Sequence, residues 1–453
     1  MSAPAATQTT DAARQRRSTV GAFVGTAIEW YDFYIFGTAA ALVFGHVFYP
    51  GASPGAALIA SFATFWVGFL ARPIGGIIFG HFGDKLGRKN ILVITLVMMG
   101  AATTLIGLLP GYATIGVAAP ILLVCLRAIQ GIAAGGDWGG ALLIATENAS
   151  EKKKGFAGAW VQQGSPAGSI LATLMFMLVG LLPDDAFLTW GWRIPFLMSA
   201  LLVMVGLIIR LKVEESVEFE AAKATKKVVK MPITEVFRVA PAPVFFGIVA
   251  SIMGISLAYF TNTFLLSWTT GSLGIERQTM LNVLLGMAVL QFIWQPIAAL
   301  IAERIGATRT MILGLVVTVL MVVPFFMAIA SANPGLIAVT LYVVTLGGTA
   351  YYALLANSLA AAFPANVRYT GVSLAYQLCS SLIGGATPLI AQWILNSTGG
   401  SPWGVALFFT ALLLATIAGV AGLKRAGDRA HARAAVAAEN EAAASAALPS
   451  DAR

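Results

Sequence analysis

Five charged residues lie inside apolar segments that are long enough to cross a lipid bilayer: Glu29, Asp32, Arg72, Arg127 and Asp137. A charged side chain near the middle of a bilayer costs roughly 2.5–3.5 kcal/mol on insertion scales, so such residues face the interior of a helix bundle and pair with one another. A carboxylate beside an arginine is ionised, and it takes up a proton when the pair opens, because desolvation disfavours an isolated charge. Buried acid–base pairs of this kind can therefore carry protons.

Heights along the predicted helices sort the five residues into two tiers. At a rise of about 1.5 Å per residue, Asp32 lies about 20 Å from the cytoplasmic end of its span, and Arg127 lies about 14 Å from the outer end of its own. In a hydrocarbon core of about 30 Å these levels nearly coincide. Glu29, Arg72 and Asp137 lie roughly 12–15 Å from cytoplasmic ends. The sequence therefore predicts Asp32 beside Arg127, and Glu29 with Arg72 and Asp137 in a second tier.

Each of these residues has an expected role. We expect Asp32 to take the transported proton, and Glu29 is the second candidate for proton coupling. Arg127 either pairs with Asp32 or binds an anionic substrate, because arginine stays charged and presents a bidentate fork. Arg72 and Asp137 are expected to form a buried charge network. The alternative is that all of these charges only lock the first, second and fourth helices together.

The overall composition is that of a membrane protein. Of 453 residues, 58% are hydrophobic and 11% are charged, whereas a soluble globular chain carries roughly a quarter charged residues. We therefore expect an all-α integral membrane protein. Apolar runs of the ~20 residues that cross a bilayer predict twelve helices, at 19–46, 55–80, 91–110, 118–147, 155–182, 192–213, 242–269, 279–302, 309–330, 335–362, 369–395 and 402–424.

The distribution of basic residues predicts the orientation. With both termini inside, the outer loops keep only Arg193 and Arg277, and the remaining loop and tail lysines and arginines lie on the cytoplasmic side, as the positive-inside rule requires. We expect a multi-pass protein of the cell (inner) membrane that acts as a monomer and contacts membrane lipid, with no nucleic-acid partner. The predicted parts are a cytoplasmic tail (1–18), a six-helix bundle (19–213), a cytoplasmic loop (214–241), a second six-helix bundle (242–424) and a second cytoplasmic tail (425–453).

An internal repeat relates the two halves. Asp84-Lys85-Leu86-Gly87 lies between the second and third spans, and Glu303-Arg304-Ile305-Gly306 lies between the eighth and ninth. Both stretches present an acid, a base, one further residue and then glycine. Two homologous bundles with a site between them at mid-membrane are a common architecture of secondary transporters.

The first of these stretches resembles a family signature. "GHFGDKLGRK", which begins at Gly80, matches the loop motif G-x-x-x-D-[RK]-x-G-R-[RK] of the major facilitator superfamily at every fixed position. This resemblance implies the twelve-helix, two-bundle fold of that family. It also implies that the loop is an inner gate, formed by Gly80, Asp84, Lys85, Gly87, Arg88 and Lys89, with Glu303 and Arg304 as the counterparts in the second half.

Further stretches resemble the metabolite:proton symporter branch of that superfamily. They are "EWYDF", "ARPIGG", "RAIQGIAAGGDWGGALLIATENA", "WGWRIPF" and "FPANVRYTG". The branch, as the resemblance implies, takes up small organic acids such as 2-oxoglutarate, citrate and shikimate, or zwitterions such as proline and betaine. The chain departs from the family at Asp137, where the usual residue is glutamate. It also lacks the C-terminal coiled coil of the osmolyte transporters, and Ser165 interrupts the Gly-Pro signature of exporters.

Polar residues in the spans are candidates for substrate contact. The second half lacks mid-membrane charges and offers amides and phenols in their place. A hydroxylated acid can hydrogen-bond to such groups while an arginine holds its carboxylate; the alternative is that each forms an interhelical hydrogen bond. Besides Arg127, the candidates are Tyr34, Gln130, Gln163, Tyr259, Asn262, Gln291, Gln295, Tyr351, Asn357 and Gln377.

These observations predict a proton-coupled importer of a small organic acid anion, such as a dicarboxylate or a shikimate-like metabolite, that works by alternating access. Uptake of a zwitterionic osmolyte is the first alternative, and export of a drug or metabolite is the second. We do not expect an enzyme, a cofactor or a metal site, because no nucleophile motif, nucleotide-binding loop or Cys/His metal spacing occurs.

Overall fold

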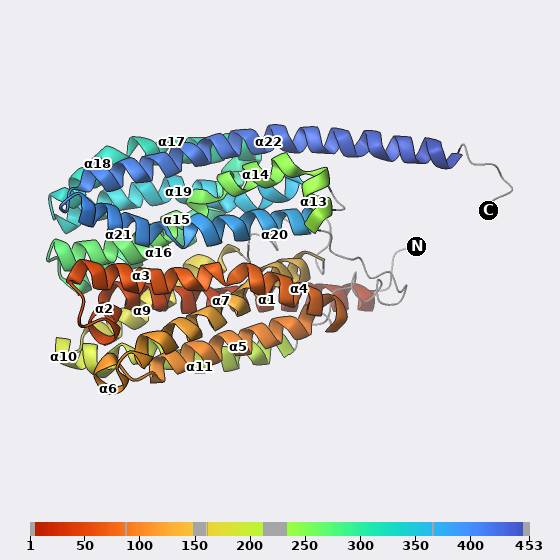
Figure 1. Cartoon of the computed structure of the whole chain (residues 1–453). Coiled ribbons are helices and arrows are strands. Elements are labelled where there is room, and N and C mark those ends of the chain that lie inside the picture. Colours follow the sequence, from red (N-terminus) through yellow and green to blue (C-terminus); the bar gives the residue numbers. More distant parts are fainter. Residues whose placement is uncertain are drawn as a thin grey trace.

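The computed structural model describes residues 5–86, 88–147, 160, 162–211, 233–364 and 367–446. Every regular element in these ranges is a helix. The helices form two bundles that lie side by side, one from the first half of the chain and one from the second (Figure 1). The start of α1 and the end of α22 lie at the same end of the bundles (Figure 1).

Six helical passes make up the first bundle, and several of them consist of two segments. In chain order the elements are α1 (Ala5–Leu42), α2 (Phe44–Phe48), α3 (Pro54–Leu70), α4 (Arg72–Leu86), α5 (Arg88–Leu108), α6 (Tyr112–Ile115), α7 (Ala118–Glu147), α9 (Gly164–Gly180), α10 (Asp184–Ala186), η2 (Phe187–Gly191) and α11 (Arg193–Leu211).

The second bundle also has six passes, preceded by a short helix. Its elements are α13 (Ile233–Val239), α14 (Pro241–Ala250), α15 (Ile252–Tyr259), η3 (Phe260–Leu265), η4 (Trp268–Ser272), α16 (Arg277–Ile305), α17 (Ala307–Leu320), α18 (Val322–Ala330), α19 (Pro334–Ala362), α20 (Arg368–Cys379), η5 (Ser380–Gly384), α21 (Thr387–Ser397) and α22 (Pro402–Ala446). The π-helical turns η3 and η5 interrupt the first and fifth passes of this bundle, and such turns are frequent at functional sites.

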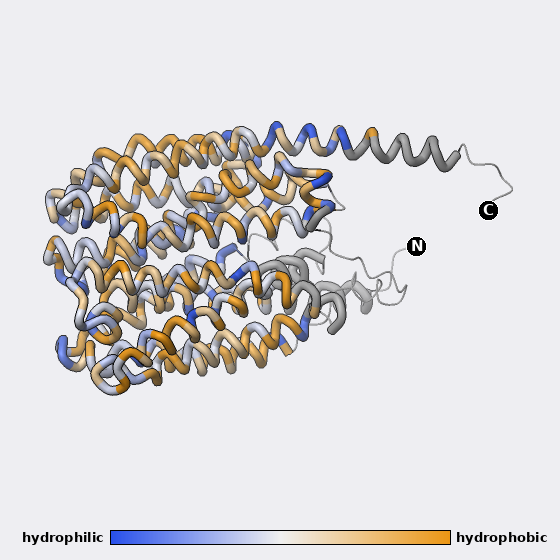
Figure 2. Tube along the Cα trace, viewed as in Figure 1, coloured by the Kyte–Doolittle hydropathy of each residue, from blue (hydrophilic) through white to orange (hydrophobic). Residues whose placement is uncertain are grey.

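The predicted fold class, twelve membrane helices in two bundles of six, is confirmed. Ten helical segments of the described chain are long and apolar enough to cross a membrane, and α9 is a shorter apolar helix. The remaining pass is α1, whose N-terminal part is polar. Hydrophobic positions run along the length of the helices, whereas hydrophilic positions gather in α13 and in the coloured turns of α22 that extend past the bundle (Figure 2).

Contacts between the two bundles occur at several heights. α1 contacts η3, α3 contacts α21 and η5, and α9 contacts α16. α20 contacts α4 and α7 from the other bundle. Near the centre, the Trp66 indole donates a hydrogen bond to the Ser381 carbonyl (2.7 Å), and the Ser381 hydroxyl donates one to the Phe69 carbonyl (2.7 Å). Both of these hydrogen bonds between the bundles have a backbone carbonyl as acceptor, so they do not depend on the protonation of an acidic side chain.

Inside the first bundle, glycines let the second and fourth passes cross at backbone contact. A Cβ atom on Gly131 would overlap the carbonyl of Gly68, and one on Gly135 would overlap the carbonyl of Arg72. Small residues at such crossings allow close approach of membrane helices. This crossing places α4, which carries Arg72, directly against α7, which carries Arg127.

We predict that Gly131→Ala destabilises the protein by about 1–3 kcal/mol or more, because the added methyl group must push two backbones apart. Thermal unfolding of the purified protein in detergent measures the effect as a lower Tm. Gly271→Ala is the control, since a Cβ there meets nothing within 4 Å. Equal Tm values for the two variants would contradict the close crossing.

Candidate functional site

Four of the five charged residues predicted at mid-membrane are described with their side chains, and all four are buried. Asp32 and Arg127 have 1% and 0% of their surface exposed, and Glu29 and Arg72 have 5% each. Glu29 and Asp32 come from α1, Arg72 from the start of α4 and Arg127 from α7. The side chain of Asp137 lies outside the described residues. The structure therefore brings the four described charges into the interior of the first bundle.

Within the second predicted tier, Glu29 and Arg72 lie together as expected. The Glu29 Oε1 and Arg72 Nη2 atoms are 3.9 Å apart, a distance that gives ionic attraction without a short hydrogen bond. The Arg72 guanidinium also lies over two rings, with its Cζ 4.2 Å from the Phe33 centroid and 4.6 Å from the Phe69 centroid. Cation–π contacts of this kind are strengthened when the cation is desolvated.

The predicted pairing of Asp32 with Arg127 is not observed: among the described residues, these two side chains do not form a direct ion pair within 4.0 Å. The Asp32 carboxylate instead accepts two hydroxyl hydrogen bonds. Ser199 on α11 donates to Oδ1 (2.7 Å), and Thr103 on α5 donates to Oδ2 (2.9 Å). The pair was predicted because both residues lie at the same height in the membrane. Height alone does not determine toward which neighbouring helix a side chain points.

A chain of hydrogen bonds joins Arg127 to Asp32 indirectly. Arg127 Nη1 donates to Gln130 Oε1 (3.1 Å), and Gln130 Nε2 donates to Thr103 Oγ1 (2.6 Å). Thr103 in turn donates to Asp32. Hydrogen bonds to charged groups in a medium of low dielectric polarise one another. A change in the charge of Asp32 therefore reaches Arg127 through two neutral side chains.

Aromatic rings hold the Arg127 guanidinium on its other sides. Its Cζ lies 4.1 Å from the Phe36 centroid, 4.4 Å from Phe33, 4.8 Å from Phe65 and 5.8 Å from Phe69. Its Nε donates a hydrogen bond to the Phe65 carbonyl at 3.3 Å. Phe33 lies under both arginine guanidinium groups, so the two cations share one ring.

Tyr259 of α15 brings the second bundle to this cluster. It is fully buried, and its ring contacts Phe65 and Phe69 at centroid distances of 5.0 and 5.1 Å. Two rings of α1 also contact Tyr259: Trp30 stacks on it and Tyr34 lies tilted against it, each at a centroid distance of 6.1 Å.

Three hydrogen-bond donors in this cluster lack an acceptor within the described part of the chain: Arg72 Nε, Arg127 Nη2 and the Tyr259 hydroxyl. Buried polar groups in folded proteins are normally hydrogen-bonded, because an unsatisfied group costs about 1–3 kcal/mol or more. Two guanidinium groups and a phenol with unused donors provide the chemistry to bind a carboxylate.

Most other candidates for substrate contact serve contacts between helices. Tyr34 shares a hydrogen bond with Ser165 (3.3 Å), Gln163 donates to the Phe292 carbonyl (3.1 Å), and Asn262 accepts from Ser169 (3.3 Å). The Gln163 and Asn262 bonds both link α9 or its first turn to the second bundle. The Tyr351 hydroxyl donates to the Ala250 carbonyl inside the second bundle.

The remaining amide candidates divide by exposure. Gln295 and Gln377 are buried, and their Oε1 atoms lack a donor among the described residues, as does Gln163 Oε1. Gln291 is half-exposed and Asn357 is exposed. The buried amides offer acceptors that complement the donors of the charge cluster.

The predicted gate falls largely outside the described side chains. This holds for Gly80, Asp84, Lys85, Gly87 and Arg88. Lys89 is described, and its Nζ donates a hydrogen bond to the Leu211 carbonyl at the last residue of α11 (2.8 Å). Glu303 and Arg304 lie exposed at the end of α16. The gating role of these residues remains a prediction.

Sequence reasoning did not single out Thr103 and Ser199, which bind Asp32, or the phenylalanines around the arginines. Hydroxyl groups are common in membrane helices, where they bond to their own backbone, and nothing in the sequence distinguishes these two. A sequence signal existed for Phe33, Phe65 and Phe69, which lie at helical spacing from Glu29, Arg72 or each other.

The chain is similar to known membrane transporters along most of its length. Residues 22–388 match the family model described as Major Facilitator Superfamily. The shikimate transporter of Escherichia coli (strain K12) is 40% identical over 406 residues, which cover 88% of this chain and 92% of that protein. The glycine betaine/proline/ectoine/pipecolic acid transporter OusA of Dickeya dadantii (strain 3937) is 35% identical over 403 residues, 86% of this chain and 79% of that protein.

A crystal structure of a D-xylose-proton symporter has the same fold. It matches with a TM-score of 0.70 over 90% of this chain and 96% of that chain, at 17% sequence identity. At this identity the likeness concerns the arrangement of the helices alone.

We predict that Thr103→Val lowers substrate accumulation about tenfold or more at equal protein abundance. The substitution keeps the shape of the side chain but removes both the donor to Asp32 and the acceptor for Gln130, and a hydrogen bond to a charged group is worth about 1.5–3 kcal/mol. Uptake into vesicles measures the effect. Thr104→Val is the matched control, because the Thr104 hydroxyl bonds only to the Gly100 carbonyl of its own helix. A tenfold loss in both variants would contradict the specific role of Thr103.

Proposed function

The chain belongs to the major facilitator superfamily and is a membrane transporter, and we propose that it imports a small organic acid anion together with protons. The observation that carries this proposal is the group of unused donors on Arg72, Arg127 and Tyr259, all buried at the centre. An arginine binds a carboxylate with two parallel hydrogen bonds, which gives both energy and geometric selectivity. The name of the shikimate transporter, a relative at 40% identity, is in keeping with an acid as substrate.

The charge balance of the cluster explains why protons accompany the acid. With Glu29 and Asp32 ionised, the two carboxylates neutralise Arg72 and Arg127, the two arginines of this cluster. A bound monoanion adds one negative charge in a desolvated centre, and protonation of one carboxylate removes it. Asp32 suits this step, since hydroxyls rather than arginines bind its oxygens. A dianion requires two protons to avoid opposing a membrane potential that is worth about 2.3 kcal/mol per charge per 100 mV.

Alternating access is the proposed mode of movement. The bundles contact each other on both sides of the cluster, through α20 with α4 and α7 and through α21 with α3. The four described charges are at most 5% exposed, so these contacts must open in turn to admit substrate. We assign the inner gate to the loop residues Asp84, Lys85, Arg88 and Lys89. The proposed orientation has both termini in the cytoplasm of a cell whose inner membrane holds the protein, which acts as a monomer.

Uptake of a zwitterionic osmolyte is the second candidate function. Trp30, Tyr34 and Tyr259 form an aromatic group in which Trp30 stacks on both tyrosines, and aromatic faces bind quaternary ammonium groups. The similarity to the OusA transporter gives this alternative a specific basis.

Uptake of labelled compounds into vesicles distinguishes the two candidates. The panel contains shikimate, 2-oxoglutarate, citrate, proline and glycine betaine, each with an imposed inward proton gradient and with the gradient collapsed. We expect one of the acids to accumulate only with the gradient, because protonation offsets its charge. Accumulation of betaine or proline but of no acid would establish the alternative, and gradient-independent export of cationic dyes would exclude both.

We predict that Asp32→Asn abolishes gradient-driven accumulation and leaves exchange of internal for external substrate (counterflow) within about threefold of the wild type. The amide oxygen can accept one of the two hydroxyl hydrogen bonds and the amide nitrogen can donate to the other hydroxyl, but the side chain can no longer gain or lose a proton. Asp185→Asn, which changes an exposed acid in an outer loop, is the control for the altered formal charge. Accumulation by Asp32→Asn at the wild-type level would remove Asp32 from proton coupling.

A further inference from the structure

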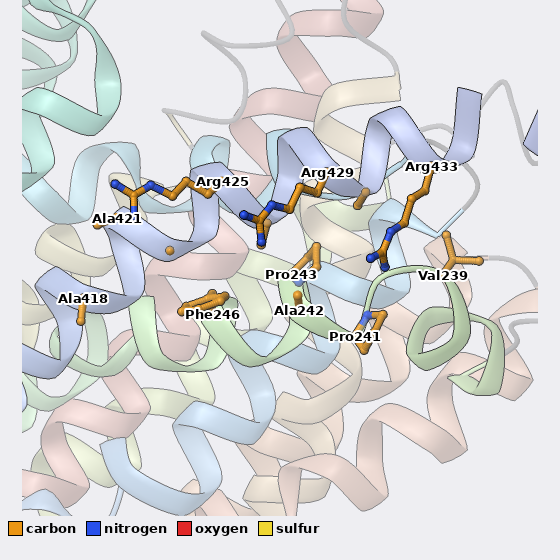
Figure 3. Close-up of a pocket in the computed structure, with 13 residues that line it drawn as sticks. Val239, Pro241, Ala242, Pro243, Phe246, Ala418, Ala421, Arg425, Arg429 and Arg433 are labelled. Atoms are coloured by element: carbon orange, nitrogen blue, oxygen red, sulfur yellow. The ribbon is translucent and has the colours of Figure 1, made fainter. Parts of the chain in front are cut away.

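A groove far from the charge cluster lies between α22 and the junction of α13 with α14. It has a volume of about 510 Å³. One wall is the part of α22 from Ala418 to Arg433, and the other is formed by Val239, Pro241 and Phe246 (Figure 3). None of the residues that line it takes part in the proposed transport mechanism.

Three arginines form the upper wall of this groove. Arg425, Arg429 and Arg433 are four residues apart and therefore share one face of α22. In Figure 3 the side chains of Arg429 and Arg433 extend from α22 toward α14, and that of Arg425 runs along α22. All three are exposed. Across the residues that the structure describes, none of the three forms a salt bridge within 4.0 Å. Three positive charges within about 12 Å of helix repel one another and attract an anion.

The opposite wall is apolar. The rings of Pro241, Pro243 and Phe246 lie below the arginines in Figure 3, and Ala418 and Ala421 add apolar surface on the α22 side of the groove. The groove thus combines a cationic rim, formed by the three arginines, with a hydrocarbon surface. A small hydrated anion would use only the rim.

The position of the groove matches the edge of a bilayer. α22 is apolar until Leu423, and charged residues begin at Lys424. On the apolar side of this border, Leu414 and Phe245 are 54% and 61% exposed, as expected for side chains that face acyl chains. The rim therefore lies at the level of lipid headgroups, and the apolar wall lies next to the hydrocarbon.

We propose that this groove binds one anionic phospholipid of the cytoplasmic leaflet, with its phosphate held by Arg429 and Arg433 and an acyl chain against Phe246. Guanidinium groups bind phosphate oxygens in a bidentate manner, and basic pockets between membrane helices on the cytoplasmic side suit such headgroups. The leaflet follows from the proposed orientation; the binding site itself does not depend on the transported substrate.

Lipid-induced stabilisation of the full chain tests the proposal. The protein is purified in detergent, stripped of lipid, and unfolded by heating with phosphatidylglycerol, with phosphatidylcholine or with glycerol 3-phosphate. The test variant is Arg429→Gln/Arg433→Gln. The matched control is Arg309→Gln/Lys424→Gln, which removes two exposed positive charges outside the groove.

We expect phosphatidylglycerol to raise the Tm of the wild type and the control by several degrees, and to raise that of the groove variant by less than half as much. Phosphatidylcholine and glycerol 3-phosphate should have little effect. Mass spectrometry of lipid that co-purifies before stripping should show at least a twofold loss of phosphatidylglycerol in the groove variant only. Arg429→Lys/Arg433→Lys should retain an intermediate response, because the charge remains but the fork is lost.

Three results would overturn the proposal. An equal lipid response in the groove and control variants would place the lipid elsewhere. A full response to glycerol 3-phosphate would mean that the rim binds a soluble anion. A loss of Tm in the groove variant without any lipid would mean that a carboxylate of the chain itself occupies the arginines.

Discussion

Two guanidinium groups removed from water are the constraint on which the centre of this molecule depends. Arg127 is fully buried and Arg72 nearly so, and each guanidinium group presents a planar fork of N–H donors that needs partners. The protein replaces their hydration with phenylalanine faces, one glutamate, one glutamine and a backbone carbonyl. Removal of one partner from such a buried set leaves an uncompensated charge and is strongly destabilising. The close glycine crossing of the second and fourth passes contributes to this arrangement, because it brings the helices that carry the two arginines together, and both guanidinium groups contact the ring of Phe33.

The aromatic shell connects this electrostatic centre to the relative position of the bundles. Tyr259 belongs to the second bundle, and its ring packs on Phe65 and Phe69, the same rings that contact Arg127. A movement of one bundle against the other must therefore change the surroundings of that cation. Packed interfaces of this kind adopt discrete arrangements rather than deform continuously. A site built in this way can couple the charge of a bound substrate or proton to the opening of the protein toward one side of the membrane or the other.

The sequence was sufficient for the architecture because a bilayer restricts the choices. Twelve apolar runs can only be helices, since every backbone polar group must be satisfied within its own segment. Heights from helical rise were also sufficient to bring Glu29 and Arg72 together. They failed for Asp32, whose partners depend on the rotation of three helices about their axes. The hydroxyls of Thr103 and Ser199 resemble many others in the chain, and only their convergence on one carboxylate distinguishes them. For the same reason, sequence could not separate Tyr259, which reaches the cluster, from Tyr351, which bonds to a carbonyl of its own bundle.

The differing partners of the two carboxylates suggest a division of work in the proposed mechanism. Glu29 lies near an arginine that an incoming carboxylate would also seek, so substrate and Glu29 compete for Arg72. Asp32 is bound by hydroxyls, and protonation there leaves those bonds in place while it removes the negative charge that the Thr103–Gln130 chain transmits to Arg127. Arg127 then has an unbalanced positive charge and a free Nη2 group, which favours an anion. The proton would thus prepare the arginine that binds the acid, and departure of the acid would favour release of the proton. Coupling of this kind requires no direct Asp32–Arg127 contact, only a neutral connection between them that conformational change can interrupt.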